Sequence, residues 1–422
     1  MLQLINKFKK DPFYYLLLFF SASICWNLDI STYIMLVLGF FWIFEAFKAP
    51  RILIKTFKTP LFYLVAAPWL WSFVGLLYSD DIEHGLFIIG VSACMFFLPL
   101  FLHGINQKKH LTQKQVKYIL FGIIFSSTSC ALFCFTMSFM DFLSINGSTS
   151  NFYYIHLTHV NLSPGSLGNY TVFSLFIILL SIAGTKPFYK QKNTALLFLL
   201  FLINFLFLYF LQAKAAILAF IVGGFIFLFY VLKKKYGFKF ASSFTLVLFF
   251  IFSALIYTKG TTFLGSRFNG LLQSKEAFSK NKENSTNLRL SAIHGSIDLI
   301  KNNFWIGVGT GAVKTKLIDF YKKNSYKKAE KHKTDTHNQF FRSFAKHGVI
   351  GFILVSFLFF IPFYYGIKQK SIFLLLFGLL QFIMAQTGDI LDNQPGVVFH
   401  CFVSSILLFI YLDLLKKEKP SF

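Results

Sequence analysis

The chain has 422 residues, of which 55% are hydrophobic and only 14% are charged. A soluble domain carries about 25% charged residues, so this composition excludes most classes of soluble protein and indicates a membrane protein. The formal net charge of +24 would suit nucleic acid, anionic lipid or membrane-orientation signals. The distribution of that charge along the chain favours the last two.

Twelve apolar segments follow one another along the chain, each near the length of about 20 residues that a membrane helix needs. The first follows Lys7, Lys9 and Lys10, and we expect it to be retained as a helix because no cleavage pattern comes after it. Backbone amides in hydrocarbon must be hydrogen-bonded within the chain, so an all-α integral membrane fold is predicted. The predicted spans are 12–28, 31–47, 60–79, 85–105, 116–140, 167–185, 192–212, 215–232, 238–258, 348–367, 370–388 and 393–415.

The charges between these segments alternate in sign. Lys and Arg dominate the segments that would be cytoplasmic, from Lys7–Lys10 to Lys416–Lys419, whereas the short outer segments carry mainly Asp and Glu. Positively charged loops stay inside, so both termini are predicted to be cytoplasmic. Lys214 is the only basic residue in a short outer segment.

Residues 259–347 separate the ninth and tenth spans and are predicted to form a basic domain on the outer side. This segment holds 17 Lys and Arg against six acidic residues, and long loops cross the membrane regardless of charge. Such a surface attracts anionic head groups. The predicted organisation is nine spans over 1–258, the loop domain over 259–347, and three spans with a cytoplasmic tail over 348–422.

Three features stand out in the loop before its final motif. Residues 286–302 carry apolar side chains at helical spacing behind the candidate caps Ser285 and Thr286. The alternating glycines of Gly307–Gly311 predict a tight turn or a close approach of backbone to a partner; no strand precedes them, so they are not a dinucleotide fingerprint. The basic stretch 322–333 is either a solvated, mobile segment or a contact for lipid phosphates.

The run from Asp335 to Asn338 leads into the tenth span. Asp335 or Thr336 can cap the entering helix, which would place His337 in its first turn. Backbone N–H groups and the positive helix end favour a bound anion there. An imidazole titrates near neutral pH, so His337 is either a candidate base or an ordinary surface histidine.

His337-Asn338, followed by Gly348 and Gly351, resembles the signature of the bacterial O-antigen ligase family. The resemblance is strongest over 205–395. It implies a fold similar to the polyprenyl-dependent membrane glycosyltransferases, with the large periplasmic loop between the ninth and tenth spans. It also implies transfer of a glycan from undecaprenyl diphosphate to a sugar of the lipid A core. The reaction would occur at the periplasmic face of the bacterial inner membrane, without metal or other cofactor.

The same resemblance suggests the site residues. Lys214 stands where the family usually has an Arg, so the positive charge is kept but bidentate recognition of phosphate is lost. Arg289 matches the family's second Arg, and Arg267 matches a basic position more loosely. Asp389 matches an acidic position near the outer end of the eleventh span; it would orient His337 or a basic residue, or simply be an interfacial acid.

These residues suggest a mechanism. Lys214 and Arg289 would bind the diphosphate and stabilise the leaving oxygen, while His337 would take the proton from the acceptor hydroxyl. A single displacement would invert the anomeric centre. The residues expected to contribute to substrate binding are Lys214, Arg289, Arg267, Asn338 and Asp389.

Three alternatives remain open from the sequence. An O-antigen polymerase or a protein O-glycosylating transferase would use the same donor with a different acceptor. A transporter would carry ionisable residues at mid-membrane and an internal repeat, and the chain offers few of the former and no evident repeat.

Overall fold

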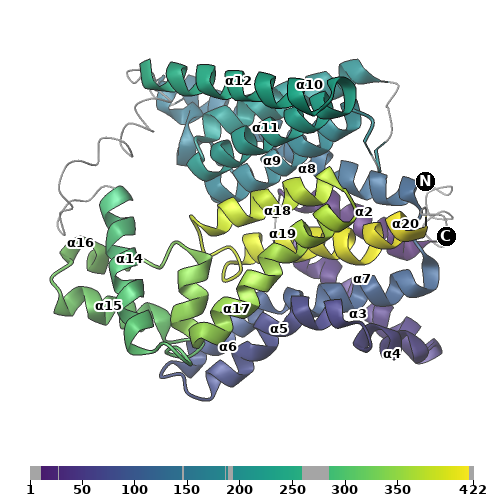
Figure 1. Cartoon of the computed structure of the whole chain (residues 1–422). Helices are drawn as coiled ribbons and strands as arrows, with labels where there is room; N and C mark the ends of the chain where they lie inside the picture. Colours follow the sequence, from purple (N-terminus) through teal and green to yellow (C-terminus); the bar gives the residue numbers. More distant parts are fainter. Residues whose placement is uncertain are drawn as a thin grey trace.

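The computed structural model describes residues 11–26, 28–144, 147–185, 187–188, 193–258 and 285–417. Within these ranges every regular element is a helix (Figure 1), which confirms the predicted all-α class. Eight helical stretches of the described chain are long and apolar enough to cross a membrane. They are α3 (Leu28–Lys48), α6 (Ile82–Ser92) running into α7 (Cys94–Lys109), α8 (Gln113–Ser144), α9 (Pro164–Ile182), α10 (Thr194–Leu211), α11 (Lys214–Tyr236), α17 (Gln339–Lys368), and α19 (Gln394–Ser405) continuing through the π-helical η3 (Ile406–Tyr411) into α20 (Leu412–Lys417).

The remaining four predicted spans coincide with α2 (Pro12–Ser23), α5 (Pro60–Leu76), α12 (Phe238–Thr258) and α18 (Ile372–Ala385), of which α2, α5 and α18 are short helices of 12, 17 and 14 residues. A short helix, α4 (Arg51–Phe57), connects α3 to α5. Two 3₁₀ turns, η1 (Thr149–Phe152) and η2 (Tyr154–Leu157), connect α8 to α9. Each predicted span therefore coincides with a helix, although several of these helices are shorter than a full crossing.

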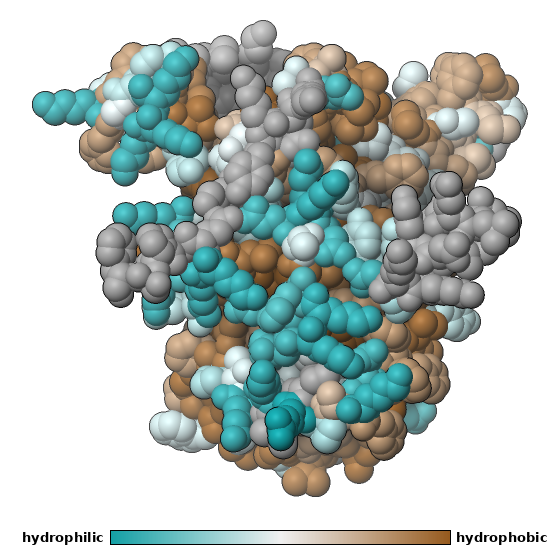
Figure 2. Space-filling model, turned by 90° about the vertical axis from the view of Figure 1, so that its right-hand side faces the viewer, coloured by the Kyte–Doolittle hydropathy of each residue, from teal (hydrophilic) through white to brown (hydrophobic). Residues whose placement is uncertain are grey.

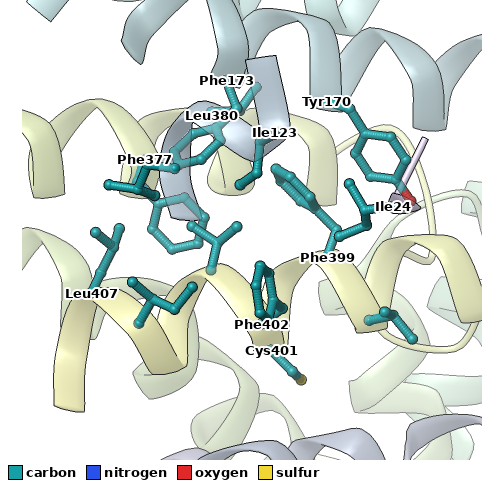
Figure 3. Close-up of a cluster of buried hydrophobic side chains, with 14 of the residues drawn as sticks. Ile24, Ile123, Tyr170, Phe173, Phe377, Leu380, Phe399, Cys401, Phe402 and Leu407 are labelled. Atoms are coloured by element: carbon teal, nitrogen blue, oxygen red, sulfur yellow. The ribbon is translucent and has the colours of Figure 1, made fainter. Parts of the chain in front are cut away.

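The core of the bundle is built around α19, which packs against α7 and α9. The residues from Gly396 to Ser405 are all buried, as expected for a mostly apolar helix in the middle of a bundle. Figure 3 shows Phe399 and Phe402 of α19 among aromatic side chains of α9 and α18. The ring of Phe399 lies 4.7 Å from that of Tyr170 and 5.5 Å from that of Phe173, centroid to centroid.

The outside of the bundle is strongly apolar. Phe40, Phe47 and Leu77 are 73%, 84% and 87% exposed, as expected for side chains that face lipid. Figure 2 views the end of the bundle at which α20 and the start of α2 lie, where hydrophilic residues gather in the middle and hydrophobic residues surround them. The loop helices lie at the opposite end (Figure 1). The predicted inside and outside orientation stays a prediction.

The loop between α12 and α17 contains a small folded unit of three helices: α14 (Ser285–Asn302), α15 (Val313–Lys323) and α16 (Lys327–Lys331). The predicted helix over 286–302 is confirmed by α14. The basic stretch 322–333 forms the end of α15 and the whole of α16, and its own residues Tyr326 and Ala329 are buried. It therefore belongs to a folded unit, while its predicted mobility or contact with lipid phosphates stays a prediction.

The alternating glycines lie between α14 and α15 and form a turn whose backbone is hydrogen-bonded to both α5 and α17. The N–H of Gly309 donates to the carbonyl of Lys346 (3.0 Å), and the N–H of Thr310 donates to the carbonyl of Gly75 (3.1 Å). Gly309 has a φ of +96°, and a Cβ there would lie 2.6 Å from the Cα of Ser79. The predicted close approach of backbone is confirmed, and the partner is the protein itself.

The tenth span begins earlier than predicted. α17 starts at Gln339, and the predicted start at 348 falls on a kink at His347 and Gly348, where Gly348 has a φ of +63°. The predicted boundary between the loop domain and the last three spans therefore lies within one helix. The start of α17 contacts both parts of the protein, since Phe340 packs in the core of the bundle and α14 contacts α17.

Candidate functional site

The segment that leads into α17 is held by one carboxylate. Asp389, between α18 and α19, accepts hydrogen bonds from Thr336 Oγ1 (2.6 Å) and from the backbone N–H groups of His337 (3.2 Å) and Asn338 (3.1 Å). His337 has a left-handed φ of +49°, which costs a non-glycine residue about 1–2 kcal/mol. We call Thr336, His337, Asn338 and Asp389 the cradle, because Asp389 holds the backbone from which the imidazole projects.

The cap of α17 differs from the predicted one. Asn338 is the cap, and its Oδ1 accepts from the N–H groups of Phe340 (2.9 Å) and Phe341 (3.0 Å). Its Nδ2 donates to the carbonyl and the side-chain oxygen of Gln386. His337 therefore precedes the helix, and its expected place in the first turn was wrong. Both ends of the Asn338 amide are engaged within the protein, so a substrate contact by this residue remains a prediction.

Beneath the cradle, α17 carries a buried charge network that the sequence analysis missed. Lys346 Nζ lies 2.7 Å from Asp392 Oδ1, and Gln339 Nε2 donates to Asp392 Oδ2 at 2.9 Å. Arg342 pairs with Asp335 and lies 3.8 Å from Asp392. The Arg342 and Asp392 side chains are each 4% exposed. The available signal was the helical spacing of Gln339, Arg342 and Lys346, which puts them on one face.

This network fastens the loop between α18 and α19 to α17. Although burial opposes it, the Lys346 ammonium and the Arg342 guanidinium hold the pKa of Asp392 well below its usual range. Removing one partner of a buried pair costs about 3–5 kcal/mol, because the other charge is left uncompensated. Asp389 belongs to the same loop, so the network fixes the position of the cradle.

Lys214 and Arg289, which are far apart in the sequence, line one cavity of about 240 Å³. Its walls come from the start of α9, the junction of α10 and α11, α14, and the loop between α18 and α19. α9 packs closely on α11, since a Cβ at Gly168 would lie 2.7 Å from that of Ala216. Lys214 is the first residue of α11, so its charge adds to the positive end of that helix and favours an anion.

The cavity and the cradle share the loop between α18 and α19. Thr387, Gly388 and Ile390 line the cavity on either side of Asp389. The positive charge of Arg289 also acts on the imidazole of His337. The structure thus brings Lys214, Arg289 and His337 to the same end of the bundle, whereas Arg267 lies outside the described residues.

The protonation states follow from this arrangement. Desolvation of the ring, together with the charge of Arg289, lowers the pKa of His337, so the imidazole is neutral at pH 7. Burial raises the pKa of Asp389 to about 6, against the opposing effects of Arg342 and the Thr336 hydroxyl. Asp389 is therefore mostly ionised at pH 7, as its three hydrogen-bond donors require.

Comparison with known proteins adds one match. Residues 197–356 match the family model described as O-antigen ligase, and this range contains Lys214, Arg289 and the His337-Asn338 pair. No curated protein matches the chain. Residues 197–356 of this multi-pass membrane protein are therefore a domain of the O-antigen ligase family, as the sequence motifs predicted.

Proposed function

We propose that this protein is an O-antigen ligase, which transfers a glycan from undecaprenyl diphosphate to a sugar of the lipid A core. The reaction takes place at the periplasmic face of the bacterial inner membrane. The family domain supports a ligase or polymerase-like activity in general. The observation that carries the finer proposal is that Lys214 and Arg289 line a single cavity whose wall continues into the loop that holds His337.

The diphosphate binds between the two cations. Lys214 contributes its ammonium at the N-terminal end of α11, and Arg289 contributes its guanidinium from α14. Both charges are in place before the reaction, so they stabilise the negative charge that builds on the leaving oxygen without further reorganisation. Removing one such preorganised donor typically slows catalysis by about 10²–10³-fold.

His337 acts as the general base. Its lowered pKa keeps the imidazole neutral at pH 7, which leaves a ring nitrogen able to accept a proton. The acceptor hydroxyl oxygen attacks the anomeric carbon and gives its proton to that nitrogen. The bond from the anomeric carbon to the diphosphate breaks, and undecaprenyl diphosphate leaves with the electron pair. General base catalysis of this kind contributes about 10²–10⁴-fold.

Transfer assays on variants test this proposal. His337→Ala, Lys214→Gln and Arg289→Gln should each lower the rate by at least about 10²-fold while leaving membrane insertion and the melting temperature unchanged. His332→Ala is the matched control, because His332 is an exposed histidine of the same loop. Wild-type turnover in the His337→Ala protein would rule out this histidine as the base.

The acceptor is tested separately by the cell-surface glycan of a deletion strain. Loss of a ligase leaves polymerised glycan on its lipid carrier, without attachment to the lipid A core. Loss of a polymerase instead leaves the core carrying single repeats. Loss of a protein-glycosylating transferase leaves both intact and removes glycan from protein. Only the first pattern agrees with the proposal.

A further inference from the structure

One buried side chain in the cavity wall has no hydrogen-bond partner among the described residues. Gln212 ends α10 with a left-handed φ of +50° and is only 5% exposed. Among the described residues, neither its Oε1 nor its Nε2 has a hydrogen-bond partner. Native proteins leave few buried polar groups unpaired, because each one destabilises the fold. Two unpaired ends on one left-handed residue indicate that this amide serves something other than stability.

A second amide in the same wall, that of Asn169, is oriented by a hydrogen bond from Gln381. Asn169 of α9 is 2% exposed and lines the cavity. Its Oδ1 accepts from Gln381 Nε2 at 3.0 Å, and Gln381 Oε1 lies 3.3 Å from His400 Nδ1. This buried chain uses the acceptor end of Asn169, so its Nδ2 is left for the cavity. Both amides therefore belong to residues that line the cavity, and the donor and acceptor groups of Gln212 are not paired within the described protein.

The hydrogen-bond donors and acceptors of these two amides favour one class of ligand. A lipid chain would leave these amides unpaired, and a phosphate could not satisfy the N–H groups and the acceptor of Gln212 together. Neighbouring sugar hydroxyls, each both a donor and an acceptor, satisfy them all. Gln212 lies two residues from Lys214 in the same cavity, and the group joined directly to the donor's diphosphate is a sugar.

We propose that Gln212 and Asn169 form a subsite that binds the first sugar of the lipid-linked glycan through its hydroxyl or amide substituents. This inference rests on the proposed function. The cavity of about 240 Å³ is smaller than the roughly 300–1,000 Å³ of sites for drug-sized ligands. It therefore holds the sugar next to the diphosphate, while the rest of the glycan extends outside. Gln212 determines which first sugar is accepted.

The test compares two probes on the full-length protein in lipid nanodiscs. One is undecaprenyl diphosphate without sugar. The other is the lipid-linked glycan that accumulates in a strain lacking the protein. The wild type should bind the glycosylated lipid more tightly. Gln212→Leu should weaken binding of the glycosylated lipid by about 10-fold or more, as expected when a substrate's hydrogen-bond partner is removed, and leave binding of undecaprenyl diphosphate within twofold.

Thermal stability provides the second measurement. Gln212→Leu should keep or raise the melting temperature, because an apolar side chain replaces an unpaired buried amide. Gln381→Leu is the matched contrast: that amide is paired, so its loss should lower the melting temperature. Gln212→Gly, which relieves the left-handed strain, should reproduce the binding defect in a protein that folds at least as well as the wild type.

The outcomes separate the two proposals. Equal weakening of both probes by Gln212→Leu, or no change in either, overturns the sugar subsite and leaves the proposed function standing. A fall in melting temperature on Gln212→Leu and Gln212→Gly makes Gln212 structural and also overturns it. If the wild type binds neither lipid, the proposed function itself fails. Selective loss of the glycosylated probe in a stable variant supports the subsite.

Discussion

Asp389→Asn tests whether the cradle positions the base. Asp389 Oδ1 accepts from Thr336 Oγ1 and the Asn338 N–H, and Oδ2 accepts from the His337 N–H. An asparagine can keep the oxygen at only one of these places. If it stays toward Thr336 and Asn338, its NH₂ faces the His337 N–H, donor against donor. One charge-assisted hydrogen bond, worth about 1.5–3 kcal/mol, is then lost.

The lost bond is the one that holds the left-handed backbone of His337. That conformation costs about 1–2 kcal/mol, so the variant should relax and turn the imidazole away from the acceptor. A loss of about 2 kcal/mol in the population of the correct geometry corresponds to a roughly 30-fold fall in kcat. KM for the lipid-linked donor should stay near the wild-type value, because Lys214 and Arg289 are unchanged.

The pH dependence gives an independent check. His337 must be neutral to accept a proton, and Asp389, with a pKa of about 6, must be ionised to accept its three hydrogen bonds. Both requirements hold above their pKa values and fail below them. Wild-type kcat should therefore be flat near neutral pH and fall as the pH drops through about 6. In the Asp389→Asn protein this acid limb should move to lower pH, because one titrating group and its negative charge are gone.

Steady-state transfer kinetics between pH 5 and 8, together with melting temperatures, provide the assay. Asp319→Asn is the control, because Asp319 is an exposed carboxylate of the loop helix α15. The reasoning would be refuted if Asp389→Asn retained wild-type kcat and an unshifted acid limb in a protein of unchanged stability.

Three further predictions concern neighbouring features. Asn338→Ala removes the cap of α17 and should cost about 0.5–2 kcal/mol, seen as a lower melting temperature that Asn338→Ser largely restores. Gly348→Ala places a Cβ 2.2 Å from the carbonyl oxygen of Trp305 at a φ of +63° and should abolish folding or insertion. Gly90→Ala is the control, because a Cβ there meets nothing within 4 Å, and it should leave folding and insertion intact. Lys214→Arg adds one possible hydrogen bond to phosphate, worth about 1 kcal/mol, and should lower KM for the donor about fivefold; a higher KM would show that the cavity is shaped for lysine.

Much of the architecture could be predicted from the sequence, because hydrophobicity and helix propensity act over short distances along the chain. The twelve apolar segments coincide with helices, and α14 begins within one residue of the predicted start. The glycine turn was predicted as a close backbone approach, although the sequence did not show that α5 and α17 are the elements it joins.

The site was predicted less well where several residues competed for one role. Asp335 and Thr336 were reasonable caps for α17, but Asp335 pairs with Arg342 and the Thr336 hydroxyl donates to Asp389. Asp335 is therefore engaged by a side chain of α17 itself and Thr336 by Asp389 from another loop, and Asn338 is left to cap the helix. Local propensity ranked the candidates, and tertiary contacts decided among them.

The sequence by itself determined that this is an all-helical membrane protein with a basic loop, because burying apolar segments in lipid needs no particular partner. Only the tertiary structure decided which polar groups meet. Asp392 pairs with Lys346, and Gln212 is left with an unpaired amide in the cavity wall. A polar group away from water must find a specific partner, and that partner's place in the chain is set by how the helices pack.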